Sequence, residues 1–218
     1  MKTALFLSCC LFALGARAAM NDSEIRDAYY KSYRDEKAQS YADAIRALAP
    51  VAEANPQGYT VNLRLGWLNY LQGSYAASRT YYETAMKVAP NSIEARLGYL
   101  LPLLALERYT DAESVAQQVI RVDPANYYAN LRLAYALRLQ KKYAAAEEIV
   151  SRQLVSYPTD VSLLTELGLL KVAQNRPAER IFNDVLTLDP ENAVAKAQLS
   201  KPTLSVKTNE PPTKVTKP

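Results

Sequence analysis

The residues that most often carry out chemistry in proteins are scarce in this sequence. Histidine is absent, and the two cysteines, Cys9 and Cys10, both lie near the start of the chain. The remainder therefore lacks the commonest general base, the thiolate nucleophile and most soft metal ligands. Glu147 and Glu148 are adjacent carboxylates, but neighbours on a helix diverge by about 100°, so we expect a solvated helix face there. No glycine-rich phosphate-binding loop is present. The sequence predicts no catalytic residue, no metal site and no cofactor.

The net charge of +4 is unevenly distributed along the chain. Lys2 and Arg17 contribute two positive charges near its start. Residues 200–218 contribute a net three more, from four lysines and Glu210, which leaves −1 for residues 18–200. A nearly neutral body is not the electrostatic footprint of a nucleic-acid-binding protein, so we expect no nucleic-acid partner.

Residues 1–19 have the pattern of a secretory signal peptide. Lys2 supplies the positive start, residues 4–14 the apolar stretch, and Ala16-Arg17-Ala18 fits the rule for cleavage before Ala19. The apolar stretch is about half of the ~20 residues needed to cross a bilayer, so an uncleaved anchor is the weaker alternative, as are a buried helix and a lipid-anchored cysteine. We expect an exported protein, periplasmic or otherwise extracytoplasmic. Its mature chain would have no cysteine and no integral membrane span.

A period of 34 residues organises most of the chain. Prolines, tyrosines and small residues each recur with this spacing, and the last interval in two of the three series is 32. The members of the three series are Pro56, Pro90, Pro124, Pro158 and Pro190; Tyr41, Tyr75, Tyr109 and Tyr143; and Ala44, Ser78, Ala112, Ala146 and Ala178. Such a period indicates a repeat architecture, in which each repeat is one structural unit.

Within one period the apolar residues have helical spacing. Leu63, Trp67, Tyr70 and Leu71 lie at i, i+4, i+7 and i+8, which places them on one face of a helix. A turn signal follows, and we expect a second helix over residues 75–88, closed by the proline that ends the period. Each unit is thus a helical hairpin, too small to bury its own apolar face, so neighbouring hairpins must stack.

The hairpins resemble the tetratricopeptide repeat, a 34-residue unit with Leu-Gly in the first helix, a Gly-x-Tyr turn and a closing proline. Residues 59–92 match best, through Leu65-Gly66, Gly73, Tyr75 and Pro90. The resemblance implies an all-α fold, a right-handed α-solenoid of helix–turn–helix hairpins. We expect about five hairpins and a C-terminal capping helix within residues 20–199, then a disordered Lys/Pro/Thr tail at 200–218. The expected hairpins are 25–58, 59–92, 93–126, 127–160 and 161–192.

Three of these hairpins depart from the family pattern. In 25–58 the first helix is displaced or extended. In 93–126 Tyr99-Leu100 replaces the Leu-Gly pair, and in 161–192 the turn at residues 175–177 is shortened by two.

In tetratricopeptide proteins the first helix of each hairpin lines a concave groove, chiefly through repeat positions 2, 5, 9, 12 and 13. Transferred to this sequence, the resemblance implies an apolar, aromatic groove. Its expected partner-binding residues are Leu63, Trp67, Tyr70, Leu97, Leu101, Leu104, Tyr128, Leu131, Tyr135 and Arg138. The basic and asparagine clamp of the chaperone-binding members is missing from positions 5 and 9. A C-terminal carboxylate is therefore not the expected ligand.

Residues 97–106 are almost entirely apolar, and a helix that is apolar on every side is normally covered on every side. We expect a non-enzymatic binding scaffold or adaptor of the cell envelope that holds an apolar peptide or helix of a partner protein. The alternative is a self-associating structural scaffold, a homo-oligomer whose groove is filled by its own chain. The lysines of the tail add a weak contact with an anionic envelope surface.

Overall fold

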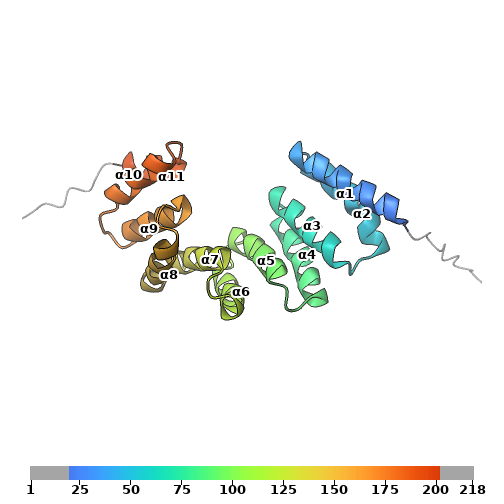
Figure 1. Ribbon diagram of the computed structural model, residues 1–218, viewed down its shortest axis with the longest axis horizontal. Helices are drawn as coiled ribbons and strands as arrows, with labels where there is room; N and C mark the ends of the chain where they lie inside the picture. Colours follow the sequence, from blue (N-terminus) through green and yellow to red (C-terminus); the bar gives the residue numbers. More distant parts are fainter. Residues whose placement is uncertain (1–19, 202–218) are drawn as a thin grey trace, which may run out of the picture. The chain divides into compact units, whose positions relative to one another are not determined.

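In the computed structural model, residues 20–201 are described, and over this range the chain forms eleven helices and no strand (Figure 1). The expected all-α fold of helical hairpins is confirmed. The predicted signal peptide (1–19) and all of the predicted tail beyond Lys201 lie outside the described residues. The helices are α1 (Asp22–Lys37), α2 (Tyr41–Ala54), α3 (Tyr59–Leu71), α4 (Tyr75–Val88), α5 (Ile93–Ala105), α6 (Tyr109–Val122), α7 (Tyr127–Leu139), α8 (Tyr143–Ser156), α9 (Val161–Ala173), α10 (Glu179–Leu188) and α11 (Ala193–Leu199).

The chain divides into two compact units between Tyr99 and Leu100, inside α5. In the first unit α1 packs on α2, α2 on α3 and α3 on α4. In the second unit each helix from α6 to α9 packs on the next, α7 also contacts α9, and α10 packs on both α9 and α11. We call the first helix of each hairpin (α1, α3, α5, α7, α9) its A helix and the second its B helix.

Every hairpin turns at the same place, the fifteenth repeat position. The residue there has a φ between +55° and +82°, in the left-handed region. These five residues are Gln39, Gly73, Glu107, Lys141 and Asn175. A Cβ costs about 1–2 kcal/mol in this conformation, yet only one of the five is glycine. The packing of the two helices therefore imposes the turn, and glycine is not required for it.

Glycines in the A helices make room for aromatic rings from the B helices. Tyr82 of α4 is 4% exposed and lies between Gly66 of α3 and Gly98 of α5. A Cβ on Gly66 would lie 2.9 Å from the ring, and one on Gly98 only 2.2 Å. Gly168 and Phe182 make the same pairing in the second unit, at 2.6 Å. Ring and glycine are thus complementary in volume, as a close-packed interior requires.

The small residues that keep the 34-residue period are all buried, at positions where a larger side chain would push neighbouring helices apart. They are Ala44, Ser78, Ala112, Ala146 and Ala178. In hairpin 93–126, Leu100 takes the place of the A-helix glycine, and the B-helix position of Tyr82 is taken by Ala116. Both are fully buried. In this hairpin the larger residue of the pair is on the A helix, whereas in hairpin 59–92 it is on the B helix. This exchange explains how hairpin 93–126 departs from the Leu-Gly pattern.

Two tyrosines at the first repeat position reach the end of their own repeat, where the next A helix begins. The hydroxyl of Tyr59 lies 2.7 Å from Ser92 Oγ and donates to Glu94 at 3.1 Å. Tyr127 donates to both carboxylate oxygens of Asp160 at 3.0 Å. Burial, together with this hydrogen bond to Asp160, raises the pKa of Tyr127 to about 12.

The two terminal hairpins differ from the others in length. Helix α1 begins three residues before the expected start of its hairpin, because Asn21 and Glu24 form a capping box there. Helix α10 has 10 residues where other B helices have 14, and Ala178 stands at its N-cap. The short helix α11 then packs on the cluster that contains Phe182 and Val185.

Candidate functional site

The A helix α3 exposes one face and buries the rest. Residues at repeat positions 2, 5, 9, 12 and 13 are exposed or half-buried, whereas those at positions 3, 4, 6, 7, 8, 10 and 11 are buried. The first set is Thr60, Leu63, Trp67, Tyr70 and Leu71, so the side chains that remain accessible are largely apolar and aromatic. We call this set of positions the A-helix face.

Helix α7 repeats this arrangement in the second unit. Tyr128 is 57% exposed and Tyr135 38% exposed, while Leu131 and Arg138 are half-buried. The predicted residues of α5, Leu97, Leu101 and Leu104, are also half-buried. All ten side chains predicted for partner binding are therefore outside the buried core. Whether they bind a partner stays a prediction.

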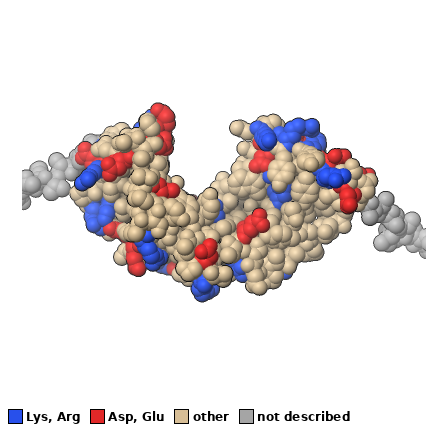
Figure 2. All heavy atoms as spheres, viewed as in Figure 1, with Lys and Arg blue, Asp and Glu red and all other residues tan. Residues whose placement is uncertain are grey.

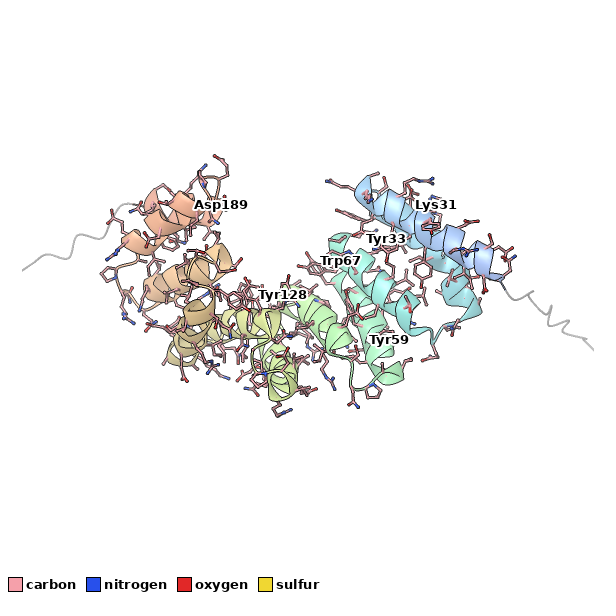
Figure 3. The ribbon with its side chains drawn as sticks, in the orientation of Figure 1. Lys31, Tyr33, Tyr59, Trp67, Tyr128 and Asp189 are labelled. Atoms are coloured by element: carbon pink, nitrogen blue, oxygen red, sulfur yellow. The ribbon has the colours of Figure 1, made fainter. Side chains whose placement is uncertain are left out.

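Trp67 belongs to a polar cluster between α1 and α3 in the first unit. Its Nε1 donates to Glu36 Oε1 at 2.7 Å, and its ring stacks on Tyr70 with centroids 5.9 Å apart. Glu36 also forms an ion pair with Arg64, whose guanidinium lies 3.8 Å from the ring centroid of Tyr33. Tyr33 and Trp67 are labelled in Figure 3. These contacts hold Trp67 in place but leave it half-buried at the surface.

A second cluster joins α7 to α9. Arg138 makes two hydrogen bonds to Glu166, from Nε at 2.6 Å and from Nη2 at 3.1 Å. Its guanidinium lies 5.2 Å from the ring centroid of Tyr135. Since the side chains of Arg138 and Glu166 are 14% and 6% exposed, this is a largely buried, bidentate pair. Arg138 is therefore already engaged within the chain, and it orders the A-helix face beside Tyr135.

The two clusters occupy the same repeat positions with their charges reversed. Glu36 and Arg138 both stand at position 12 of a hairpin, and Arg64 and Glu166 both stand at position 6 of the next. Sequence reasoning missed Glu36, Arg64 and Glu166. The available signal was the identical spacing of 28 residues between opposite charges in the first and the second unit.

One of the two adjacent carboxylates, Glu147, has a structural role. Glu147 accepts hydrogen bonds from Lys171, Gln174 and Arg176, so the expectation of a solvated Glu147 was wrong. The bond from Lys171 leads the causes that hold the pKa of Glu147 below 4.5. Its neighbour Glu148 is 78% exposed, as expected. The part of the chain described here contains no group of three or more His, Cys, Asp or Glu that could hold a metal ion.

None of the described helices is long and apolar enough to span a membrane.

Comparison with known proteins places this arrangement in a family. The model of the Tetratricopeptide repeat matches residues 33–93 and 103–161, more than half of the chain. A search of curated proteins found no match.

Solved structures with a similar fold include a MamA fragment from Desulfovibrio magneticus RS-1, 21% identical, with a TM-score of 0.69 over 80% of this chain and 99% of that one. TTC0263 from Thermus thermophilus is 16% identical, with a TM-score of 0.64 over 79% of this chain and 95% of that chain. YrrB, described as a TPR protein with an unusual peptide-binding site, is 12% identical, with a TM-score of 0.63 over 82% of this chain and 93% of that chain. At these identities the similarity shows a common fold.

Proteins built from these repeats serve as non-catalytic scaffolds for protein interaction. With two matches that together cover residues in both units, this chain belongs to the tetratricopeptide repeat family.

Proposed function

We propose that this protein is a non-enzymatic scaffold that binds an apolar or aromatic segment of another protein on its A-helix face. The observation that carries the proposal is the exposure pattern of α3 and α7. Positions 2, 5, 9, 12 and 13 are accessible in both helices, and most of them hold aromatic or aliphatic side chains where solvated helices carry charges. Tyr128 and Tyr135 are among the exposed large hydrophobic residues.

Two features favour an aromatic or apolar ligand over a carboxylate. Tyrosine and tryptophan offer large contact area at low cost in side-chain entropy, and they are enriched where proteins bind one another. The one arginine of the predicted set, Arg138, is bound to Glu166 and so does not present a free cation. The peptide-binding site named for the structurally similar YrrB gives an example of peptide binding on this fold.

Self-association by end-to-end stacking is disfavoured at the N-terminal end. The outer face of α1 carries Asp27, Tyr30 and Arg34 at the repeat positions that are filled by Val61, Arg64 and Leu68 in α3. The α3 residues are buried by the preceding hairpin, whereas those of α1 are exposed. Figure 2 shows basic residues gathered over α1. A charged outer face is typical of a terminal repeat that caps the stack.

We further propose that the scaffold acts outside the cytoplasm, in the cell envelope. The proposal rests on the leader pattern of residues 1–19, with Ala16-Arg17-Ala18 before the expected cleavage point. The four lysines after Ser200 add affinity for an anionic surface, at about 1 kcal/mol each.

Selection from a random peptide library against the purified protein tests the binding function. We expect the selected peptides to be rich in aromatic and aliphatic residues. Tyr135→Glu should weaken their binding at least tenfold, because it places a charge on the A-helix face. The matched control is Ala144→Glu on the exposed side of α8, which should leave binding unchanged. Equal binding by both variants would refute the proposal. A concentration-dependent dimer in light scattering, with no peptide selected, would favour self-association.

A further inference from the structure

A cleft of about 730 Å³ opens in the first unit, where α1 begins, α2 ends and α3 begins. Its walls are mostly apolar and include Ile25 and Tyr29 of α1, Val51 of α2 and Val61 of α3. A cleft of this volume, with apolar walls and a few polar groups, is typical of sites that bind small molecules or large side chains.

Two other repeats fill the corresponding place with their own tyrosine. Tyr59, labelled in Figure 3, stands at the first position of its repeat and reaches Ser92 and Glu94. Those two residues occupy the last position of the same repeat and the second position of the next. Tyr127 likewise reaches Asp160, the last residue of its own repeat. At these two junctions the phenol ring lies between hairpins, and its hydroxyl is hydrogen-bonded.

The first repeat lacks this tyrosine. Ile25 stands at its first position, and the residues that correspond to the tyrosine's hydrogen-bond partners are Gly58 and Thr60. All three line the cleft. Isoleucine is shorter than tyrosine and has no hydroxyl, and glycine adds no side chain, so the space remains open. The third repeat also has an isoleucine at this position, Ile93, but there Tyr128 takes the place of Thr60. In the last repeat the position belongs to Val161, which packs against the core cluster around Phe182.

We propose that this cleft binds the side chain of a tyrosine from a partner protein. The inference rests on the proposed scaffold function and adds an anchoring site separate from the A-helix face of α7. Neither residues 1–19 nor residues 202–218 contain a tyrosine, so those segments cannot supply the ring. Of the residues that line the cleft, Glu53 alone is charged.

Methyl-labelled full-length protein gives a direct test by nuclear magnetic resonance. The probe is the capped peptide Gly-Lys-Tyr-Lys-Gly, and the reporters are the methyl groups of Met20, Ile25, Val51 and Val61, which all line the cleft. We expect saturable shifts of these signals, while the methyls of Val185 in the second unit remain unchanged. Replacing tyrosine by alanine in the peptide should weaken binding at least tenfold.

Ile25→Tyr supplies the matching variant, because it introduces the residue that repeats 59–92 and 127–160 have at this position. It should abolish the peptide-induced shifts and leave the unfolding midpoint unchanged or higher. If this variant is destabilised, Ala54→Leu narrows the cleft from α2 and should also abolish them. Equal shifts with the tyrosine and alanine peptides, or undiminished binding by a folded Ile25→Tyr, would overturn the inference. Retained sensitivity of library-selected peptides to Tyr135→Glu in the same samples would show that the scaffold function survives that failure.

Discussion

Removing the charge of Arg138 should show how much the ion pair between α7 and α9 contributes to stability. Arg138→Met keeps the apolar stem of the side chain but leaves Glu166 unpaired. Because the Glu166 side chain is only 6% exposed, its carboxylate cannot recover its hydration. Breaking a buried pair costs about 3–5 kcal/mol, and we expect about 3 kcal/mol since Arg138 is 14% exposed. In urea this corresponds to a midpoint lowered by about 1 M or more.

Exchanging the two charges tests whether the pair stabilises the fold in either orientation. The first unit holds Glu36 and Arg64 at the corresponding positions, so Arg138→Glu combined with Glu166→Arg should regain at least half of the loss. As a control, Arg152→Met on α8 removes a cation that is 57% exposed and 4.0 Å from Glu148, and it should change stability by less than about 0.5 kcal/mol. A loss below about 1 kcal/mol for Arg138→Met would refute this reasoning about the buried pair. So would a reversed pair no more stable than Arg138→Glu alone.

Three further predictions follow from the packing, the ionisation and the leader. Gly98→Ala should lower stability by about 1–3 kcal/mol in thermal denaturation, because its Cβ would collide with the ring of Tyr82. This loss should outweigh the higher helix propensity of alanine. A more stable variant would contradict the close packing of Tyr82 against Gly98. The raised pKa of Tyr127, about 12 against 10 unfolded, stabilises the neutral phenol, so this stability is complete below pH 10 and is lost as the pH rises towards 12. Between pH 10 and 12 the urea midpoint of Tyr127→Phe should fall less than that of the unmodified protein. Identical falls would contradict the raised pKa of Tyr127. N-terminal sequencing should find a mature chain that begins at Ala19 or Met20, whereas an intact Met1 in the cytoplasmic fraction would rule out export.

The hairpin fold could be predicted because each residue type that recurs every 34 residues has a single packing role. The second helix expected at residues 75–88 is confirmed as Tyr75–Val88. Ala112 and Ala146, which recur with this period, are fully buried, because a small residue at a close helix approach has few substitutes. The exposed face of α3 agrees with the helical spacing of Leu63 and Trp67.

The ion pairs and the cleft were not predicted in this way. Glu36 meets Arg64 only because one hairpin stacks on the next, and nothing in either helix alone shows which side chain it faces. Arg138 has the right position for the A-helix face, yet it is engaged by Glu166 across the hairpin junction. The cleft lies where Ile25 and Gly58 stand in place of larger residues of repeat 59–92, and an absent side chain leaves no motif to find.

The most direct test of the binding function is to map where a library-selected peptide lies on the protein, by methyl resonance perturbation. We predict that the perturbed methyl groups belong to the A helices, with Leu63, Leu97 and Leu131 among them. The competing apolar surface is at the ends of the B helices, where Val122 and Val155 are 72% and 83% exposed. Perturbation of Val122 and Val155, with the leucines of the A-helix face unchanged, would contradict the account.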